Sequence, residues 1–118
     1  MPPKTHDNPL SSHVLDTSRG CPAEGIEINL YKQEVSNWTF VGKKVTNQDG
    51  RVSGFLDWEN FQKGVYKLHF GVKEYFEKTN TETFFPFVEI VFDIKDPEAH
   101  YHVPILLNPF GYTTYRGS

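Results

Sequence analysis

Residues 100–107 read His100-Tyr101-His102-Val103-Pro104-Ile105-Leu106-Leu107, which is the alternation expected of a β-strand with one face in a core. Residues two apart in a strand share a face. The odd positions of this stretch therefore form an apolar face for the core, and the even positions, with both histidines, form the opposite face. That opposite face mixes imidazole rings with apolar groups and carries no fixed charge. The mixture indicates a subunit interface or a ligand groove more than plain solvent.

Seven further segments are short, rich in β-branched and aromatic residues, and bounded by turn residues, so each is predicted to be a strand. They are residues 11–16, 25–31, 38–46, a short segment from Arg51, 65–72, 87–94 and 111–116. Residues 17–22 and 47–50 are expected to be turns, and residues 73–78 a brief helix. Eight short strands and one helix predict an all-β fold, an antiparallel β-sandwich of two sheets.

The length of the chain limits its organisation. With 118 residues it is expected to be one domain, which comprises residues 10–118. Residues 1–9 are polar, lack the apolar stretch of a secretory signal, and are predicted to form a disordered tail.

Charge and cysteine content exclude several classes of function. Twelve Lys and Arg against fifteen Asp and Glu give a formal net charge of −3, and no long block of either sign is present. Nucleic acid and anionic membranes are therefore not expected as partners. The single cysteine, Cys21, excludes an internal disulfide and favours a reducing compartment. We expect a soluble intracellular protein, cytoplasmic or peroxisomal and not secreted.

Several polar residues are candidates for chemistry, although each has an ordinary structural explanation. Taken singly, His13 and His102 would be surface histidines, and Arg51 would be a cation beside a turn. His100 and His102 share a face, a spacing that strand-borne metal sites also use. The last four residues, Tyr115-Arg116-Gly117-Ser118, place a planar cation, a hydroxyl and a terminal carboxylate in three consecutive positions.

Three segments resemble the transthyretin-related hydroxyisourate hydrolases. They are residues 11–23 around His13, residues 47–51 ending in Arg51, and residues 100–118 with the terminal tetrapeptide. With the region between them, the resemblance covers nearly all of the chain after the first nine residues. It implies a transthyretin-like sandwich in which the first, fourth, seventh and eighth strands form one sheet. It also implies a homotetramer with sites in a channel where two dimers meet.

The resemblance implies an activity and a set of site residues as well. The activity is hydrolysis of 5-hydroxyisourate to 2-oxo-4-hydroxy-4-carboxy-5-ureidoimidazoline in purine (urate) degradation, without a metal or an organic cofactor. The implied catalytic residues are His13, Arg51, His102 and Ser118. The implied substrate-binding residues are His13, Arg51, Tyr115, Arg116 and Gly117, with Tyr115 and Arg116 as wall and floor.

Each of these residue types suits one step of ring-amide hydrolysis. The imidazoles of His13 and His102 titrate near neutrality and are expected to position and deprotonate the attacking water; which of the two is the base stays open. The guanidinium of Arg51 is expected to hold substrate carbonyl groups and to offset developing negative charge. Ser118 is expected to orient the water or pass a proton, and Gly117 to allow close approach of the backbone.

Two other functions stay open at this point. Transthyretin is a small-molecule carrier that resembles this chain in its strand pattern but lacks the two histidines, the arginine and the terminal tetrapeptide. Tight thyroxine binding without hydrolysis would favour that reading. A metal-dependent amidohydrolase that uses His100, His102 and His13 is the second, and activity that survives chelation would exclude it.

Overall fold

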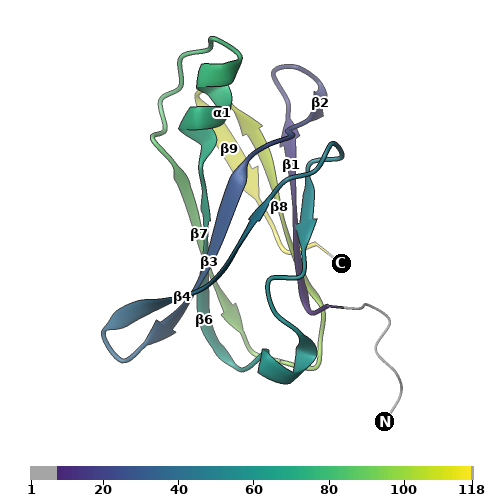
Figure 1. Cartoon of the computed structure of the whole chain (residues 1–118), viewed down its shortest axis with the longest axis vertical. Helices are drawn as coiled ribbons and strands as arrows, with labels where there is room; N and C mark the ends of the chain where they lie inside the picture. The colour runs from purple at the N-terminus through teal and green to yellow at the C-terminus, as the bar shows by residue number, and fades with distance from the viewer. Residues whose placement is uncertain (1–7, 118) are drawn as a thin grey trace.

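The computed structural model describes residues 8–117 and arranges them in two β-sheets that face each other (Figure 1). Within that part of the chain there are nine strands, one short α-helix and one 3-10 turn, in place of the eight predicted strands and one helix. The all-β prediction is confirmed. In chain order the elements are β1 (Leu10–Asp16), β2 (Cys21–Pro22), β3 (Glu27–Glu34), β4 (Asn37–Val45), β5 (Arg51–Ser53), η1 (Trp58–Asn60), β6 (Gly64–Phe70), α1 (Val72–Lys78), β7 (Val88–Ile94), β8 (Tyr101–Asn108) and β9 (Gly111–Thr114).

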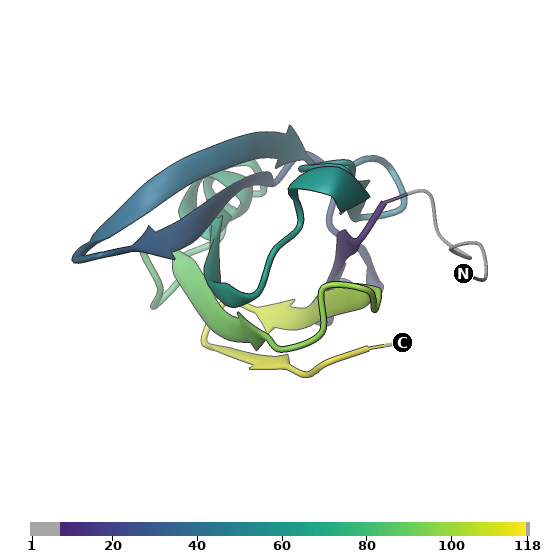
Figure 2. The same ribbon diagram turned by 90° about the horizontal axis from the view of Figure 1, so that it is seen from below.

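The two sheets group strands that are far apart in the chain. One sheet has the order β2-β1-β8-β9, with β5 also paired to β1, and the other has the order β4-β3-β6-β7. Figure 2 shows the two layers from below, with β3 and β4 opposite the yellow C-terminal strands. The first sheet contains the strands that carry the first, fourth, seventh and eighth predicted segments, so that grouping is confirmed.

The pairing of β1 with β8 is parallel, whereas the other strand pairs of the described sheets are antiparallel. A hairpin forces its two strands to run in opposite directions, but β1 and β8 are separated by the whole of the other sheet. No single turn therefore fixes the direction of one strand relative to the other. In the observed register, Ser11 lies beside His102 and His13 lies beside Pro104.

The core lies between the inner faces of the two sheets. The odd positions of β8 face it as predicted, because Ile105 and Leu107 are fully buried and Tyr101 and Val103 are each 6% exposed. Pro104 is an exception to the predicted outward face: it is buried, since β8 lies between β1 and β9. The remaining fully buried apolar residues come from both sheets and include Val14, Ile28, Leu30, Leu68 and Phe70.

The segment 17–22, predicted as a turn, contains the short strand β2. Its last two residues pair with the end of β1. The carboxylate of Asp16 accepts hydrogen bonds from the backbone amides of Ser18 and Arg19, at 3.0 and 3.1 Å. These bonds fold the chain back sharply enough for the two residues of β2 to meet β1.

Other strand boundaries differ by two or three residues, and the predicted strand 25–31 is observed as Glu27–Glu34. The predicted strand 65–72 ends at Phe70 because helix α1 follows directly. The predicted strand 111–116 ends at Thr114, where the chain leaves its pairing with β8. Within residues 8–117, no helix has both the length and the apolar character needed to cross a membrane.

Candidate active site

The parallel register of β1 and β8 brings two histidines from opposite ends of the chain together. His13 lies two residues after Ser11, the register partner of His102, so both side chains emerge on the outer face of the sheet. The centroids of the two imidazole rings are 6.5 Å apart and the ring planes are inclined by 33°. The pair predicted from the sequence is therefore formed.

Arg51 reaches the same place from the other edge of β1. It is the register partner of His13 in the antiparallel pairing of β1 with β5. The preceding turn is built around the Asn47 side chain, whose Oδ1 accepts from the amides of Asp49 and Arg51 at 2.9 and 3.0 Å. Gly50 is required in this turn, because its φ is +73° and a Cβ atom would collide with the carbonyl of Val14.

The surroundings of His13 favour its neutral form. Burial lowers the pKa of His13 below 6.5, and the nearby positive charge of Arg51 lowers it further. A hydrogen bond to the backbone of Asp49 and the Asp49 carboxylate act in the opposite direction without cancelling the shift. His13 therefore carries a free-base imidazole near neutral pH, as a group that handles the proton of a water molecule must.

The C-terminal segment runs back along β8 and packs against His102. The amide of Gly117 donates a 2.7 Å hydrogen bond to the carbonyl of His102, which extends the sheet by one isolated bridge. A Cβ atom at Gly117 would come within 2.7 Å of Cδ2 of the His102 ring. Gly117 thus packs closely against the His102 ring, and a residue with a Cβ atom would force one of the two to shift.

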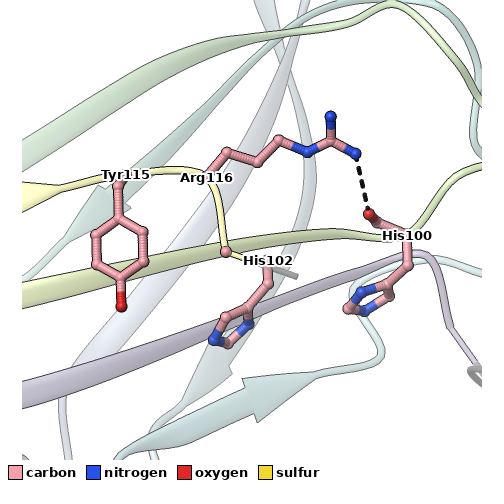
Figure 3. Close-up of a pocket in the computed structure, with 5 residues that line it drawn as sticks. His100, His102, Tyr115 and Arg116 are labelled. Atoms are coloured by element: carbon pink, nitrogen blue, oxygen red, sulfur yellow. Dashed lines mark hydrogen bonds between the residues drawn. The ribbon is translucent and has the colours of Figure 1, made fainter.

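Arg116 is turned toward the backbone of β8. Its Nη2 atom donates to the carbonyl of His100 at 3.4 Å, as Figure 3 shows, and its Cζ atom lies 4.2 Å from the centroid of the Tyr101 ring. An open pocket lies beside these groups and is lined by His100, His102, Tyr115, Arg116 and Gly117. Four residues of the predicted sets, His102 and residues 115–117, thus line one surface pocket. His13 lies next to it, beside His102.

Ser11 and His100 are two neighbours that the predicted site does not include. Ser11 Oγ lies 2.8 Å from Nδ1 of His102 and 3.4 Å from Nε2 of His100. Strand alternation puts Ser11 on the same face as His13, which is the signal in the sequence that points to it. Its partner on β8 could not be named without the register of a parallel pair.

Two further predictions concern Ser118 and a metal site. Ser118 lies outside the described residues. Within residues 8–117, no three or more His, Cys, Asp or Glu side chains are grouped so that they could hold a metal ion. The described site thus contains two imidazoles, a guanidinium from Arg51 nearby, and a backbone segment packed against one ring. Groups of these kinds can transfer protons beside a polarised carbonyl.

Comparison with known proteins relates this arrangement to a family. A family model described as HIUase/Transthyretin family matches residues 10–117. A 5-hydroxyisourate hydrolase of Mus musculus is 42% identical over 116 residues, which covers 97% of this chain and 98% of the mouse protein.

Solved structures of two kinds share the fold. The structure of a Klebsiella pneumoniae 5-hydroxyisourate hydrolase is 34% identical with a TM-score of 0.83, and the match covers 94% of this chain and 99% of that one. The structure of sea bream transthyretin in complex with thyroxine is 31% identical with a TM-score of 0.88, and the match covers 92% of this chain and 94% of that one.

Proposed function

Since the chain belongs to the HIUase/transthyretin family, we propose that its reaction, the hydrolysis of 5-hydroxyisourate, takes place at the pocket beside His13 and His102. The product is 2-oxo-4-hydroxy-4-carboxy-5-ureidoimidazoline, and the step belongs to urate degradation. The observation that carries the proposal is the 6.5 Å separation of two imidazoles that are brought together by the parallel strands β1 and β8. The match to hydrolases over nearly the whole chain supports it.

The two histidines are proposed to activate the attacking water. One neutral imidazole accepts a proton from the water, the oxygen attacks the ring amide carbonyl, and the same proton then passes to the departing nitrogen. The lowered pKa of His13 supports this scheme, because it keeps the His13 imidazole neutral near neutral pH. These steps use no metal and no organic cofactor.

Arg51 and the C-terminal segment are proposed to bind the substrate. Arg51 is the register partner of His13, so its guanidinium can stabilise the oxyanion that forms beside the activated water. Tyr115, Arg116 and Gly117 line the pocket, and Tyr115 and Arg116 are proposed as its wall and floor. Ser118 is proposed to orient the water or to relay a proton.

A homotetramer with sites where two dimers meet is also proposed. The C-terminal segment exposes three aromatic side chains: Phe110 is 66% exposed, Tyr112 40% and Tyr115, which lines the pocket, 55%. Exposed aromatic residues beside an open pocket are expected where another subunit covers the surface. Sedimentation of the protein at four times the mass of the chain would support the tetramer, and sedimentation as a monomer at assay concentration would contradict it.

The domain limits and the compartment belong to the same proposal. The proposed hydrolase domain comprises residues 10–118, with residues 1–9 as a tail, and the family match over residues 10–117 supports these limits. The single cysteine supports an intracellular location, cytoplasmic or peroxisomal, because no internal disulfide is possible.

The fold does not distinguish a hydrolase from a carrier, because hydrolase and transthyretin structures match the chain equally well. The polar residues of the site do distinguish them: a carrier of an apolar ligand has no need of two adjacent imidazoles. The carrier reading would be supported by tight binding of thyroxine together with no acceleration of 5-hydroxyisourate decay.

The decisive experiment is a direct assay. The protein is mixed with freshly generated 5-hydroxyisourate, and the ultraviolet absorbance decay is compared with the spontaneous rate. We expect strong acceleration by the natural protein and a loss of about 10²- to 10⁴-fold in the variant His102→Asn. His69→Asn is the matched control, because His69 lies on β6 of the other sheet and pairs with Glu89. An unaccelerated decay with the natural protein would overturn the proposed function.

A further inference from the structure

We propose that Ser11 is a positioning residue for the reaction: its hydroxyl holds Nδ1 of His102, so that His102 takes the proton of the attacking water through Nε2. This inference rests on the proposed function, since it concerns the same site. It also answers which of the two histidines acts as the general base, a point on which the sequence is silent.

The strand register makes the Ser11–His102 contact a fixed feature. Ser11 and His102 are register partners on the parallel pair β1 and β8, and both side chains lie on the outer face. Ser11 Oγ is 2.8 Å from Nδ1, within the usual range of an N–H···O hydrogen bond. Because an imidazole has only two ring nitrogens, a held Nδ1 makes Nε2 the nitrogen that exchanges protons with the reactants.

A second contact gives the hydroxyl proton of Ser11 an acceptor other than His102. A serine hydroxyl has one proton to donate and two lone pairs with which to accept. Ser11 Oγ also lies 3.4 Å from Nε2 of His100. When the hydroxyl proton points to His100, the oxygen accepts the Nδ1 proton of His102. The neutral His102 ring then carries a lone pair on Nε2, which is the state that a general base requires.

The proton balance of the step is simple. A water O–H bond breaks as Nε2–H forms, and the water oxygen bonds to the ring carbonyl carbon. The His102 ring is then an imidazolium whose Nδ1 proton is still held by Ser11. When the C–N bond of the substrate ring breaks, the Nε2 proton moves to the departing nitrogen. His102 returns to its starting state without any further donor or acceptor.

His13 differs from His102 in its surroundings. Its partner is the backbone of Asp49, and a hydrogen bond that raises a histidine pKa must be to an accepting carbonyl. Burial and the charge of Arg51 act more strongly and lower the pKa of His13, which keeps its imidazole neutral near neutral pH. His102 is assigned as the base because its Nδ1 is held by Ser11, and His13 is suited to orient the water.

Ser11→Ala tests the proposal in the steady state. We expect kcat to fall about 10- to 100-fold with little change in KM, which is part of the roughly 10²- to 10⁴-fold that general base catalysis contributes. Ser11→Thr keeps the hydroxyl and suits a strand, so it should restore most of kcat. In the His102→Asn background, Ser11→Ala should have no further effect, because Ser11 acts through His102. Equal losses in Ser11→Ala and Ser11→Thr, or additive losses with His102→Asn, would overturn the proposal.

Ser12→Ala is the matched structural control. Ser12 follows Ser11 on β1, is fully buried on the opposite face, and donates a 2.6 Å hydrogen bond to the carbonyl of Val103. Its removal should lower thermal stability without changing kcat. A fall in kcat as large as that of Ser11→Ala would mean that any lost hydroxyl on β1 disturbs the site, and the proposal would fail.

Nitrogen-15 NMR of the histidine rings tests the positioning without the reaction. In the natural protein His102 should be neutral with its proton on Nδ1, and in Ser11→Ala the proton should shift toward Nε2, the site preferred by a free imidazole. A natural protein with the proton of His102 on Nε2 would overturn the proposal even if Ser11→Ala failed to fold. If the natural protein did not accelerate 5-hydroxyisourate decay, the proposed function would fail, and this NMR result would still decide whether Ser11 holds Nδ1.

Discussion

Gly117 lies against the imidazole of His102 so closely that a Cβ atom would come within 2.7 Å of the ring carbon Cδ2. The 2.7 Å hydrogen bond from the Gly117 amide to the carbonyl of His102 keeps the two residues at this distance. The C-terminal segment is thus packed directly on a proposed catalytic ring.

Gly117→Ala should therefore impair catalysis without unfolding the protein. Gly117 has no left-handed φ, so alanine fits the backbone, and the collision is with the His102 ring alone. A ring or tail displaced by about 1 Å can cost on the order of 10²-fold in rate. Steady-state kinetics and a thermal melt measure the two effects. Gly111→Ala is the control, because its Cβ would meet Asn108 at an ordinary 3.7 Å; equal kinetics in the two variants would contradict the steric argument.

Arg51→Gln should lower kcat by about 10²- to 10³-fold, the usual effect of removing one donor to a developing oxyanion. The change removes a charge beside His13 and leaves the strand pairing of β5 intact. Lys43→Gln removes the same charge on the exposed strand β4, where Lys43 makes only a 3.8 Å surface ion pair with Glu27, and should leave kcat unchanged. Similar kcat values for both variants would remove Arg51 from the mechanism.

The acid limb of the pH profile should move when Arg51 is replaced. Burial, and then the charge of Arg51, holds the pKa of His13 below 6.5, so kcat/KM should stay high in the neutral range and fall as pH drops through that lowered pKa. In Arg51→Gln the pKa of His13 should rise toward 6.5, and the fall should begin at a higher pH. Proton NMR titration of His13 in both proteins provides the direct measurement. A His13 pKa that is unchanged or lower in the variant would show that the charge of Arg51 does not reach this ring.

Tyr75→Phe should destabilise the fold by about 1.5–3 kcal/mol, the range for a hydrogen bond to a charged partner. Tyr75 donates a 2.7 Å hydrogen bond to the carboxylate of Asp16, which is only 1% exposed. Burial alone would raise the pKa of Asp16, but hydrogen bonds from Ser18, Tyr75 and Arg19 more than offset it and hold the pKa below 3.8.

Because the pKa of Asp16 is lowered in the folded protein, the stability lost in Tyr75→Phe should depend on pH. A lowered carboxyl pKa contributes stability that is present above pH 3.8 and is lost as pH falls through the folded-state value. The difference between natural protein and Tyr75→Phe should therefore be large at pH 7 and shrink in strong acid, as urea unfolding at both pH values would show. Tyr66→Phe is the control, because Tyr66 bonds only to the backbone of Gln62, and its smaller loss should not depend on pH in this range.

Alternation along single strands was enough to predict much of the site. It put His13 and His102 on outward faces and Tyr101 and Val103 in the core, and the structure has these side chains where alternation places them. The pairing of β1 with β8 is a different matter, because register between distant strands depends on the packing of whole sheets. For that reason the meeting of the two histidines rested on the family resemblance, and Ser11 was missed.

The errors at element ends have local causes. The two residues of β2 have little strand character of their own, and their pairing depends on the Asp16 carboxylate that folds the preceding turn. In the C-terminal strand, alternation continues past Thr114, yet regular pairing stops there because the next residue of β8 is Pro104, which has no amide hydrogen to donate. Gly117 then forms one isolated bridge with His102. The contact of Gly117 with His102 joins two separate segments of the chain, so the pattern of either segment alone does not reveal it.

The side-by-side course of β1 and β8 also ties activity to the last stage of folding. The Ser11–His102 contact joins positions 91 residues apart, so loop closure over most of the polypeptide must precede it. A nascent chain that still lacks β8 on the ribosome holds only one of the two proposed catalytic imidazoles, so we expect it to be inactive. Recovery of turnover after dilution from denaturant would accordingly report this long-range pairing, together with the proposed assembly of subunits, rather than the formation of the hairpins.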